Sequence, residues 1–280
     1  MKNVISYVLW GDEEGRWVDL TYAIVANSAI YPEFISRFYI HESGKASRFY
    51  PFIVSLAEKF PGLVEIEIID EPIVGTKLTC YRTKPIWEDD VDILLCRDLD
   101  HITNAPERKS VERFVWHIES LICSVHAYSL HTVPYMAGLC AFRCPEVKQR
   151  IIKTAPTFQD YLDWGSKKVG YCKDWRWGCD QAILRDFFGA CGLYKDSMDF
   201  PQFTAPLTLS DYPALLVKED VYEKVVPLKC NIAALMYSNL IAPSFTGQPY
   251  DAQPSQVVEL AEIINSDITN TIKEFYAQQL

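Results

Sequence analysis

The first hundred residues alternate between short apolar runs and segments of helical periodicity, and this alternation most restricts the fold. The apolar runs predict strands at 4–10, 34–40, 63–69 and 90–96, of which the third also carries acidic residues in alternate positions. Helical spacing predicts helices over 17–29 and 47–60, and 75–89 is expected to be helical. Strands that alternate with helices favour a parallel sheet with helices on its faces. The sequence therefore predicts an α/β fold.

The rest of the chain is expected to continue the same domain. The pattern predicts a helix over 107–117, strands around 121–126 and 138–143, and a helix over 177–188. Residues 199–250 are rich in proline and have no clear period, which indicates an irregular wrap over the core. From Pro254 onward an apolar stripe at helical spacing predicts a helix packed on that core. No linker separates a second domain.

Composition and charge exclude several classes of protein. With 49% apolar residues the chain is globular, and its net charge of -10 argues against broad binding to nucleic acid or anionic membranes. Residues 121–142 carry no charged side chain and are long enough to span a bilayer. His126, His131 and Pro134 lie within them, so a buried strand, a turn and a second strand are the favoured interpretation. We expect a soluble protein.

The cysteines indicate a reducing compartment. There are nine of them, none in a Cys-x-x-Cys pair, and several lie inside apolar runs where a thiol behaves as a small hydrophobe. The first residues run directly into a strand without a signal peptide, so a cytoplasmic location is expected. A zinc site is an alternative, but the spacings fit it poorly.

Two aspartates follow the fourth predicted strand directly. Asp98 and Asp100 are two positions apart, so in an extended chain their side chains point the same way. Ligands of parallel sheets bind outside the carboxyl ends of the strands, where Gly11-Asp12 also lies. Because two adjacent carboxylates repel unless a cation lies between them, we interpret the pair as a site for Mg²⁺ or Mn²⁺ with a diphosphate. The alternative is a solvated loop with two surface aspartates.

These residues resemble a known family. Arg97-Asp98-Leu99-Asp100 resembles the metal-binding motif of GT-A-fold, nucleotide-sugar-dependent glycosyltransferases. Residues 5–12, with 27–28 and 30–32, are similar to the opening strand and helix of a microbial and viral glycosyltransferase-like group, in which Tyr81-Arg82 matches an aromatic–arginine pair. Residues 134–139 are similar to the segment that lines the acceptor side, and 177–181 resemble the Asp-Gln element of retaining enzymes such as glycosyltransferase family 8. The resemblance extends to about residue 190.

The resemblance implies a fold, a domain plan and an activity. It implies a GT-A-like (Rossmann-like) domain over 1–280, with a nucleotide-binding half at 1–100, an acceptor-side half at 101–198 and a C-terminal elaboration at 199–280. The implied activity is that of a metal-dependent, hexosyltransferase-like glycosyltransferase. It would move a sugar from a nucleotide-diphosphate sugar donor to a hydroxyl of a glycan or other acceptor.

The same resemblance suggests the site residues. Asp98 and Asp100 would share Mn²⁺ or Mg²⁺ with the donor diphosphate, and Asp180, followed by Gln181, would act on the acceptor hydroxyl as a hydrogen-bond acceptor, base or nucleophile. Helix capping is the alternative for Asp180. The family's C-terminal histidine ligand is missing, because no histidine follows His131. Asp180, His126, His131 or water could supply the third ligand, and His131 is our preferred histidine.

Further residues complete the expected donor site. Arg82 is the best candidate to contact the diphosphate, and Arg97 could neutralise an aspartate or contact a phosphate. Asp12 and Arg16 are candidates for the nucleotide base or ribose. Two alternative functions stay open. A haloacid-dehalogenase-like phosphohydrolase also uses Asp-x-Asp, although usually on its first strand, and a non-catalytic carbohydrate- or nucleotide-binding protein could keep the fold without turnover.

Overall fold

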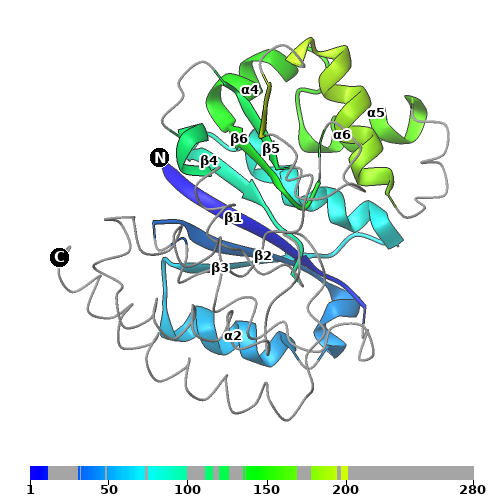
Figure 1. Cartoon of the computed structure of the whole chain (residues 1–280). Helices are drawn as coiled ribbons and strands as arrows, with labels where there is room; N and C mark the ends of the chain where they lie inside the picture. Colours follow the sequence, from blue (N-terminus) through cyan, green and yellow to red (C-terminus); the bar gives the residue numbers. More distant parts are fainter. Residues whose placement is uncertain are drawn as a thin grey trace, which may run out of the picture.

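The computed structural model describes residues 1–11, 31, 33–47, 49–72, 75–99, 111–115, 120–125, 135, 137–168, 178–193 and 197–200. In this part of the chain one sheet contains the strands β1 (Lys2–Leu9), β2 (Ile35–His41), β3 (Val64–Ile69), β4 (Val91–Cys96), β5 (Ile122–Val125), β6 (Cys140–Arg143) and β7 (Ser197–Phe200). Their order is β3-β2-β1-β4-β6-β5-β7 (Figure 1). β6 pairs antiparallel with β4 and β5, and every other neighbouring pair is parallel. The predicted α/β fold with a mostly parallel sheet is confirmed.

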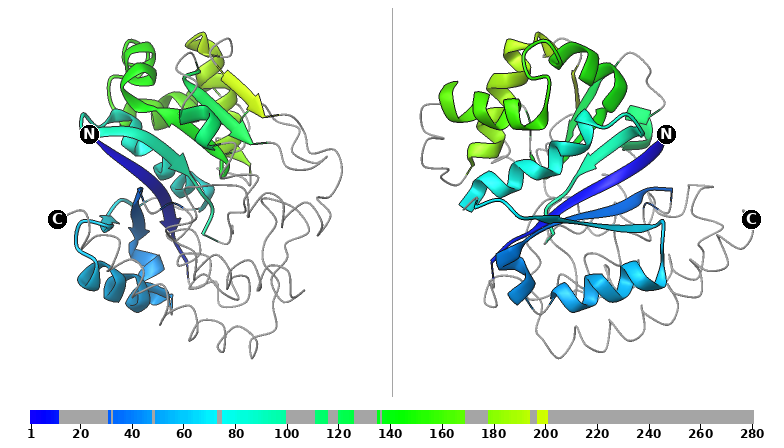
Figure 2. Two further views of the ribbon diagram at one scale, coloured as in Figure 1. Left: turned by 60° about the vertical axis from the view of Figure 1, so that its left-hand side comes forward. Right: turned by 180° about the vertical axis from the view of Figure 1, so that it is seen from behind.

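Helices cover both faces of this sheet. The helical elements are η1 (Glu42–Ala46), α2 (Phe49–Lys59), η2 (Gly75–Trp87), α4 (Cys144–Ile151), α5 (Phe158–Lys168) and α6 (Cys179–Ala190). Figure 2 shows α2 on one side of the sheet and η2, coloured cyan, with α4, α5 and α6 on the other. The predicted helices at 47–60, 75–89 and 177–188 are confirmed, the second of them as a 3-10 helix. α4, α5 and β7 were not predicted.

The central strands are buried on both faces, which explains their nearly continuous apolar sequences. On β1, Val4 packs with η2 and α4–α6, whereas Ile5 packs towards α2. On β4, Leu94 packs on the same side as Val4, and Ile93 packs on the same side as Ile5. Each strand thus contributes alternate side chains to two separate apolar layers. The peripheral β3 is half-exposed, as its alternating acidic residues predict.

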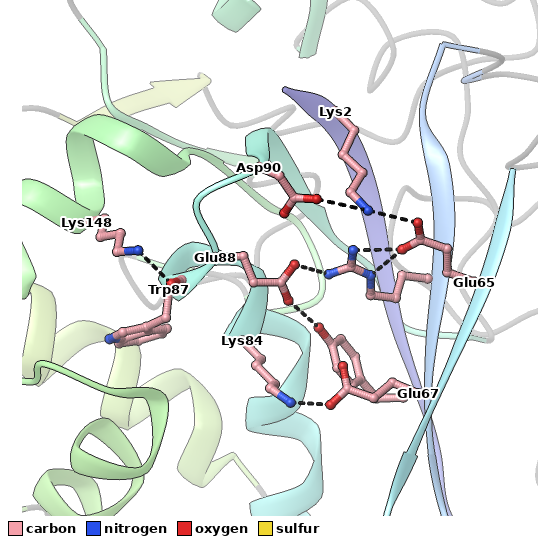
Figure 3. Close-up of polar contacts among 10 residues, drawn as sticks. Lys2, Glu65, Glu67, Lys84, Trp87, Glu88, Asp90 and Lys148 are labelled. Carbon is pink, nitrogen blue, oxygen red and sulfur yellow. Dashed lines mark hydrogen bonds and ion pairs between the residues drawn. The ribbon is translucent and has the colours of Figure 1, made fainter. Parts of the chain in front are cut away.

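Ion pairs link the amino-terminal ends of the strands, which are opposite to the carboxyl ends where the site is predicted. Arg37 lies between two carboxylates, 2.7 Å from Glu65 and 2.5 Å from Glu88. Lys2 lies 2.9 Å from Glu65 and 3.2 Å from Asp90 (Figure 3). Every one of these charges has an opposite partner, so this edge serves to hold the strands in register.

The uncharged segment 121–142 contains β5 and β6, which are the predicted pair of strands. Among the residues that the structure describes, no helix has the length and apolar character of a membrane span. The described cysteines are free thiols, and all except Cys191 are buried. The predicted helix over 17–29, residues 201–250 of the irregular segment and the C-terminal helix lie outside the described residues.

Candidate functional site

A pocket lies at the carboxyl ends of β1 and β4. The chain builds the sheet outward from β1 through β2 to β3 and then crosses to β4 on the other side of β1. This reversal of strand order leaves a crevice between β1 and β4, which is the usual ligand position in such sheets. The pocket is lined by residues of β1 and its end, of η2 and of the segment after β4: Val8, Leu9, Trp10, Thr79, Arg82, Arg97, Asp98 and Leu99.

Arg82 is the centre of the charged groups at this pocket. Its Nη1 donates a hydrogen bond to Oδ1 of Asp98, and its Nη2 donates to Oδ2 of Asp180 at 2.6 Å. Its Nε donates to the backbone carbonyl of Thr79 at 3.1 Å, so all three nitrogens of the guanidinium have acceptors. The Arg82 side chain is only 5% exposed, whereas that of Asp98 is 52% exposed. The guanidinium is therefore buried and fixed, and Asp98 is the member of the cluster that solvent reaches.

Asp180 enters the site from the first turn of α6. The helix begins after Gly178, whose φ of 81° is in the left-handed region that favours glycine. Oδ1 of Asp180 accepts a hydrogen bond from the backbone N–H of Gln181 at 2.9 Å, while Oδ2 accepts from Arg82. Both oxygens are thus engaged, one by the helix terminus and one by the guanidinium. One side chain thus binds a backbone N–H of the first turn of α6 and the Arg82 guanidinium, while the N-cap position is Gly178.

Gly138 lies against the Asp98 carboxylate, just before β6. A methyl group at position 138 would stand 2.1 Å from Oδ2 of Asp98 and 2.6 Å from its Cγ. Any residue larger than glycine would therefore occupy the space that the carboxylate uses. The segment 134–139 was expected to line the acceptor side, and the structure places its Gly138 against the Asp98 carboxylate.

Two buried groups support Arg82 and Asp98 from below. The Cys96 thiol donates to the backbone carbonyl of Arg82 at 3.3 Å. Burial raises the pKa of this thiol to about 12, so it stays protonated and acts as a donor. Arg97 is fully buried, and its Nη1 donates to the carbonyls of Cys96 at 2.7 Å and Cys140 at 3.2 Å. These bonds join β4 to β6 directly under the pocket.

Four of the predicted site residues, Asp12, Arg16, Asp100 and His131, lie outside the described residues. Of the aromatic residues of β1 and its end, Trp10 lines the pocket, whereas Tyr7 is buried and stacks on Phe38 at 5.0 Å as a core residue.

A lysine and a tryptophan near these elements lie away from the pocket. Lys84 pairs with Glu67, close to Arg37 and Glu88, and so is not part of the pocket (Figure 3). Trp164 packs edge-on against Phe187 at 5.2 Å and belongs to the core beneath α6.

The described residues fit a hard divalent cation in part. No group of three histidine, cysteine, aspartate or glutamate side chains with metal-ligand geometry is present among them. The half-exposed Asp98 carboxylate nevertheless sits in a space that a side chain at position 138 would fill, and Asp100 follows it two residues later. Carboxylate oxygens are the ligands that Mg²⁺ and Mn²⁺ prefer.

Comparisons with other proteins find similar structures only. No protein-family model matches the chain, and no curated protein matches it by sequence. The glycosyltransferase GlyE from Streptococcus pneumoniae aligns with a TM-score of 0.46 and 10% identity over 100% of this chain, which spans 64% of GlyE. The mannosyltransferase PcManGT from Pyrobaculum calidifontis, in complex with GDP-Man and Mn²⁺, aligns with a TM-score of 0.39 and 10% identity over 99% of this chain and 75% of its own.

A third structure is assigned as a glucose-1-phosphate thymidylyltransferase from Bacillus anthracis in complex with a sucrose. It aligns with a TM-score of 0.43 and 8% identity over 72% of this chain and 87% of its own. At these low scores a functional assignment has to rest on the residues of the pocket.

Proposed function

We propose that the protein is a metal-dependent, hexosyltransferase-like glycosyltransferase. It would transfer a sugar from a nucleotide-diphosphate sugar to a hydroxyl of a glycan or other acceptor. One observation carries the proposal: Arg82 joins Asp98 and Asp180, from the two most specific elements of the sequence pattern, in one cluster. A similar arrangement occurs around Arg37 at the opposite ends of the strands, but the Arg82 cluster lies at the pocket and its Asp98 is half-exposed.

The donor side of the site is assigned to the ends of β1 and β4. Asp98 and Asp100 would hold Mn²⁺ or Mg²⁺, with His131 or water as a further ligand, and the bound cation would stabilise the charge that develops on the departing nucleoside diphosphate. Trp10 offers an aromatic face at the same pocket. Asp12 and Arg16, which follow β1 in the sequence, are assigned to the base or ribose.

The acceptor side is assigned to the start of α6. Asp180 accepts hydrogen bonds from Arg82 and from the backbone N–H of Gln181, and a carboxylate can also accept a hydrogen bond from a sugar hydroxyl or take its proton. Gln181 follows at the same helix terminus. Arg82 adds a permanent positive charge beside the diphosphate position. Arg97, whose described bonds go to backbone carbonyls, would act from beneath by holding β4 against β6.

A thermal-shift experiment tests this proposal. Unfolding temperatures are measured with UDP-sugars and GDP-sugars, each with and without Mn²⁺, for the parent and for Asp98→Asn. We expect one nucleotide class to raise the unfolding temperature only with Mn²⁺, and the shift to disappear in the variant. A shift with free glycan alone would support a binding protein instead. Phosphate release from phosphomonoesters would support a phosphohydrolase, although here the Asp-x-Asp follows β4 and not the first strand.

A further inference from the structure

Asp98 and Asp180 both bind Arg82, but they differ in their exposure and in their other hydrogen bonds. Asp98 gives one oxygen to Arg82 and is half-exposed, while Asp180 is almost buried and uses both oxygens inside the protein. The guanidinium separates the two carboxylates, because each is bonded to a different Nη. Asp98 can therefore approach a cation from the pocket, whereas Asp180 would first have to give up Arg82.

The charge of Arg82 also acts on any cation that binds at Asp98. Asp98, Asp180 and Arg82 together carry one net negative charge, and the cluster without Arg82 would carry two. A positive group in direct contact with Asp98 repels a divalent cation at the same carboxylate, and the repulsion is moderated by the solvent that reaches Asp98. Arg82 must therefore weaken cation binding compared with the same pocket without it.

We propose that Arg82 is a positioning residue that sets the cation affinity of the site and keeps Asp180 out of the cation's ligand set. This inference rests on the proposed function. In such a site the cation stays weakly held by the protein alone and is held better when a diphosphate adds its oxygens. Asp180 remains available for the acceptor.

The side chain must be arginine for this purpose. Only a planar guanidinium presents separate donors to two carboxylates and a third to the Thr79 carbonyl, and it keeps its charge at every physiological pH. A lysine ammonium is a single point charge, so it could neutralise one carboxylate but could not hold both in these positions.

The experiment compares Mn²⁺ affinities in the absence of nucleotide. Free Mn²⁺ is measured by electron paramagnetic resonance during titration of the parent and of Arg82→Gln, with circular dichroism to verify folding. We expect Arg82→Gln to bind Mn²⁺ about tenfold more tightly, because the repelling charge is gone and Asp180 is released to bind the cation. An unchanged or weaker affinity in the folded variant would overturn the inference.

Arg37→Gln is the matched control. Arg37 has a side-chain exposure of 7% and also lies between two carboxylates, Glu65 and Glu88, but at the opposite edge of the sheet. Its removal should cost stability in the same way as the removal of Arg82. It should leave the Mn²⁺ affinity unchanged, and a similar gain in affinity in this variant would show that general loss of positive charge, not the site, is responsible.

Asp180→Asn gives the second measurement. In the parent it removes a negative charge but no ligand, so it should lower the Mn²⁺ affinity less than in the Arg82→Gln background, where it also removes a ligand. In the Arg82→Gln background it should remove most of the gained affinity. If Arg82→Gln does not fold, Arg82→Lys is used; its ammonium keeps the positive charge but cannot hold both carboxylates, so a smaller coupling of the same sign is expected.

The outcomes separate this inference from the proposed function. A parent that binds Mn²⁺ and shows no coupling between Arg82 and Asp180 overturns the inference alone. A parent that binds no Mn²⁺ at any concentration tested, with or without nucleotide-sugar, overturns both. An equal loss of Mn²⁺ affinity for Asp180→Asn in the parent and in the Arg82→Gln variant would likewise overturn the inference.

Discussion

Replacing Gly138 by alanine should damage the site without removing any polar group from it. The added methyl would lie 2.1 Å from Oδ2 of Asp98, whereas ordinary contact begins at 3.4 Å, so the carboxylate has to move by more than about 1 Å. Oδ1 of the same carboxylate is bonded to Arg82, so this movement should weaken the ion pair and leave Asp180 as the main charged partner of the buried Arg82.

Two magnitudes follow from this displacement. A misplacement of about 1 Å in a residue that positions the substrate can reduce turnover about 100-fold. Leaving a buried donor of Arg82 without its acceptor should lower the free energy of unfolding by about 1–3 kcal/mol. The first is measured as donor turnover with a nucleotide-sugar and Mn²⁺, and the second by urea unfolding.

A double-mutant cycle isolates the contact between the two residues. In the Asp98→Ala background the methyl at position 138 meets no carboxylate, so Gly138→Ala should there cost almost nothing in stability. The reasoning is refuted if Gly138→Ala lowers the free energy of unfolding equally with and without Asp98. Parent-like turnover of the single variant would refute it as well.

Three further predictions concern other parts of the site and the sheet. Asp100→Ala should abolish sugar transfer while the circular dichroism spectrum stays that of the parent, and transfer at the parent rate would remove Asp100 from the metal site. Asp180→Ala should lower kcat far more than it raises KM for the donor, which steady-state kinetics with saturating acceptor can test. Burial raises the pKa of Glu65, but the hydrogen bonds from Lys2 and Arg37 outweigh burial and place it below its ordinary value of 4.5. Its charged form therefore stabilises the fold above pH 4.5 and ceases to do so as pH falls through the lowered pKa, so the stability difference between the parent and Glu65→Gln in urea should shrink on acidification.

The parts of the fold that the sequence predicts are those buried on both faces. β1, β2 and β4 are apolar at almost every position because each packs against helices on either side, and such runs are unambiguous. α4 has only eight residues and follows β6 without a break, and β7 has four. Elements this short do not repeat often enough to show a period; β5 and β6 are as short as β7, but they lie in the uncharged segment that indicated two strands.

The sequence singled out three residues of the Arg82 cluster but not the bonds between them. Asp98, Arg82 and Asp180 each stood out as residues, but Arg82 and Asp180 are 98 positions apart, and no local pattern reports a bond over that separation. We assigned Arg82 to the diphosphate from its sequence alone. Its two carboxylate partners became visible only when η2 and α6 were placed on the same face of the sheet.

The position of Arg82 follows from the kind of helix that carries it. η2 has 13 residues, which is long for a 3-10 helix, since poorer hydrogen-bond geometry normally limits such runs to a few residues. Side chains compensate at intervals of three: the Thr79 hydroxyl donates to the Thr76 carbonyl, Arg82 Nε to the Thr79 carbonyl, and the Thr83 hydroxyl to the Cys80 carbonyl. With three residues per turn, residue 82 lies directly above residue 79, so the bond that stabilises the helix is also the bond that orients the guanidinium. An α-helix over the same residues would rotate Arg82 away from Thr79, and the two carboxylates would then lose their common partner.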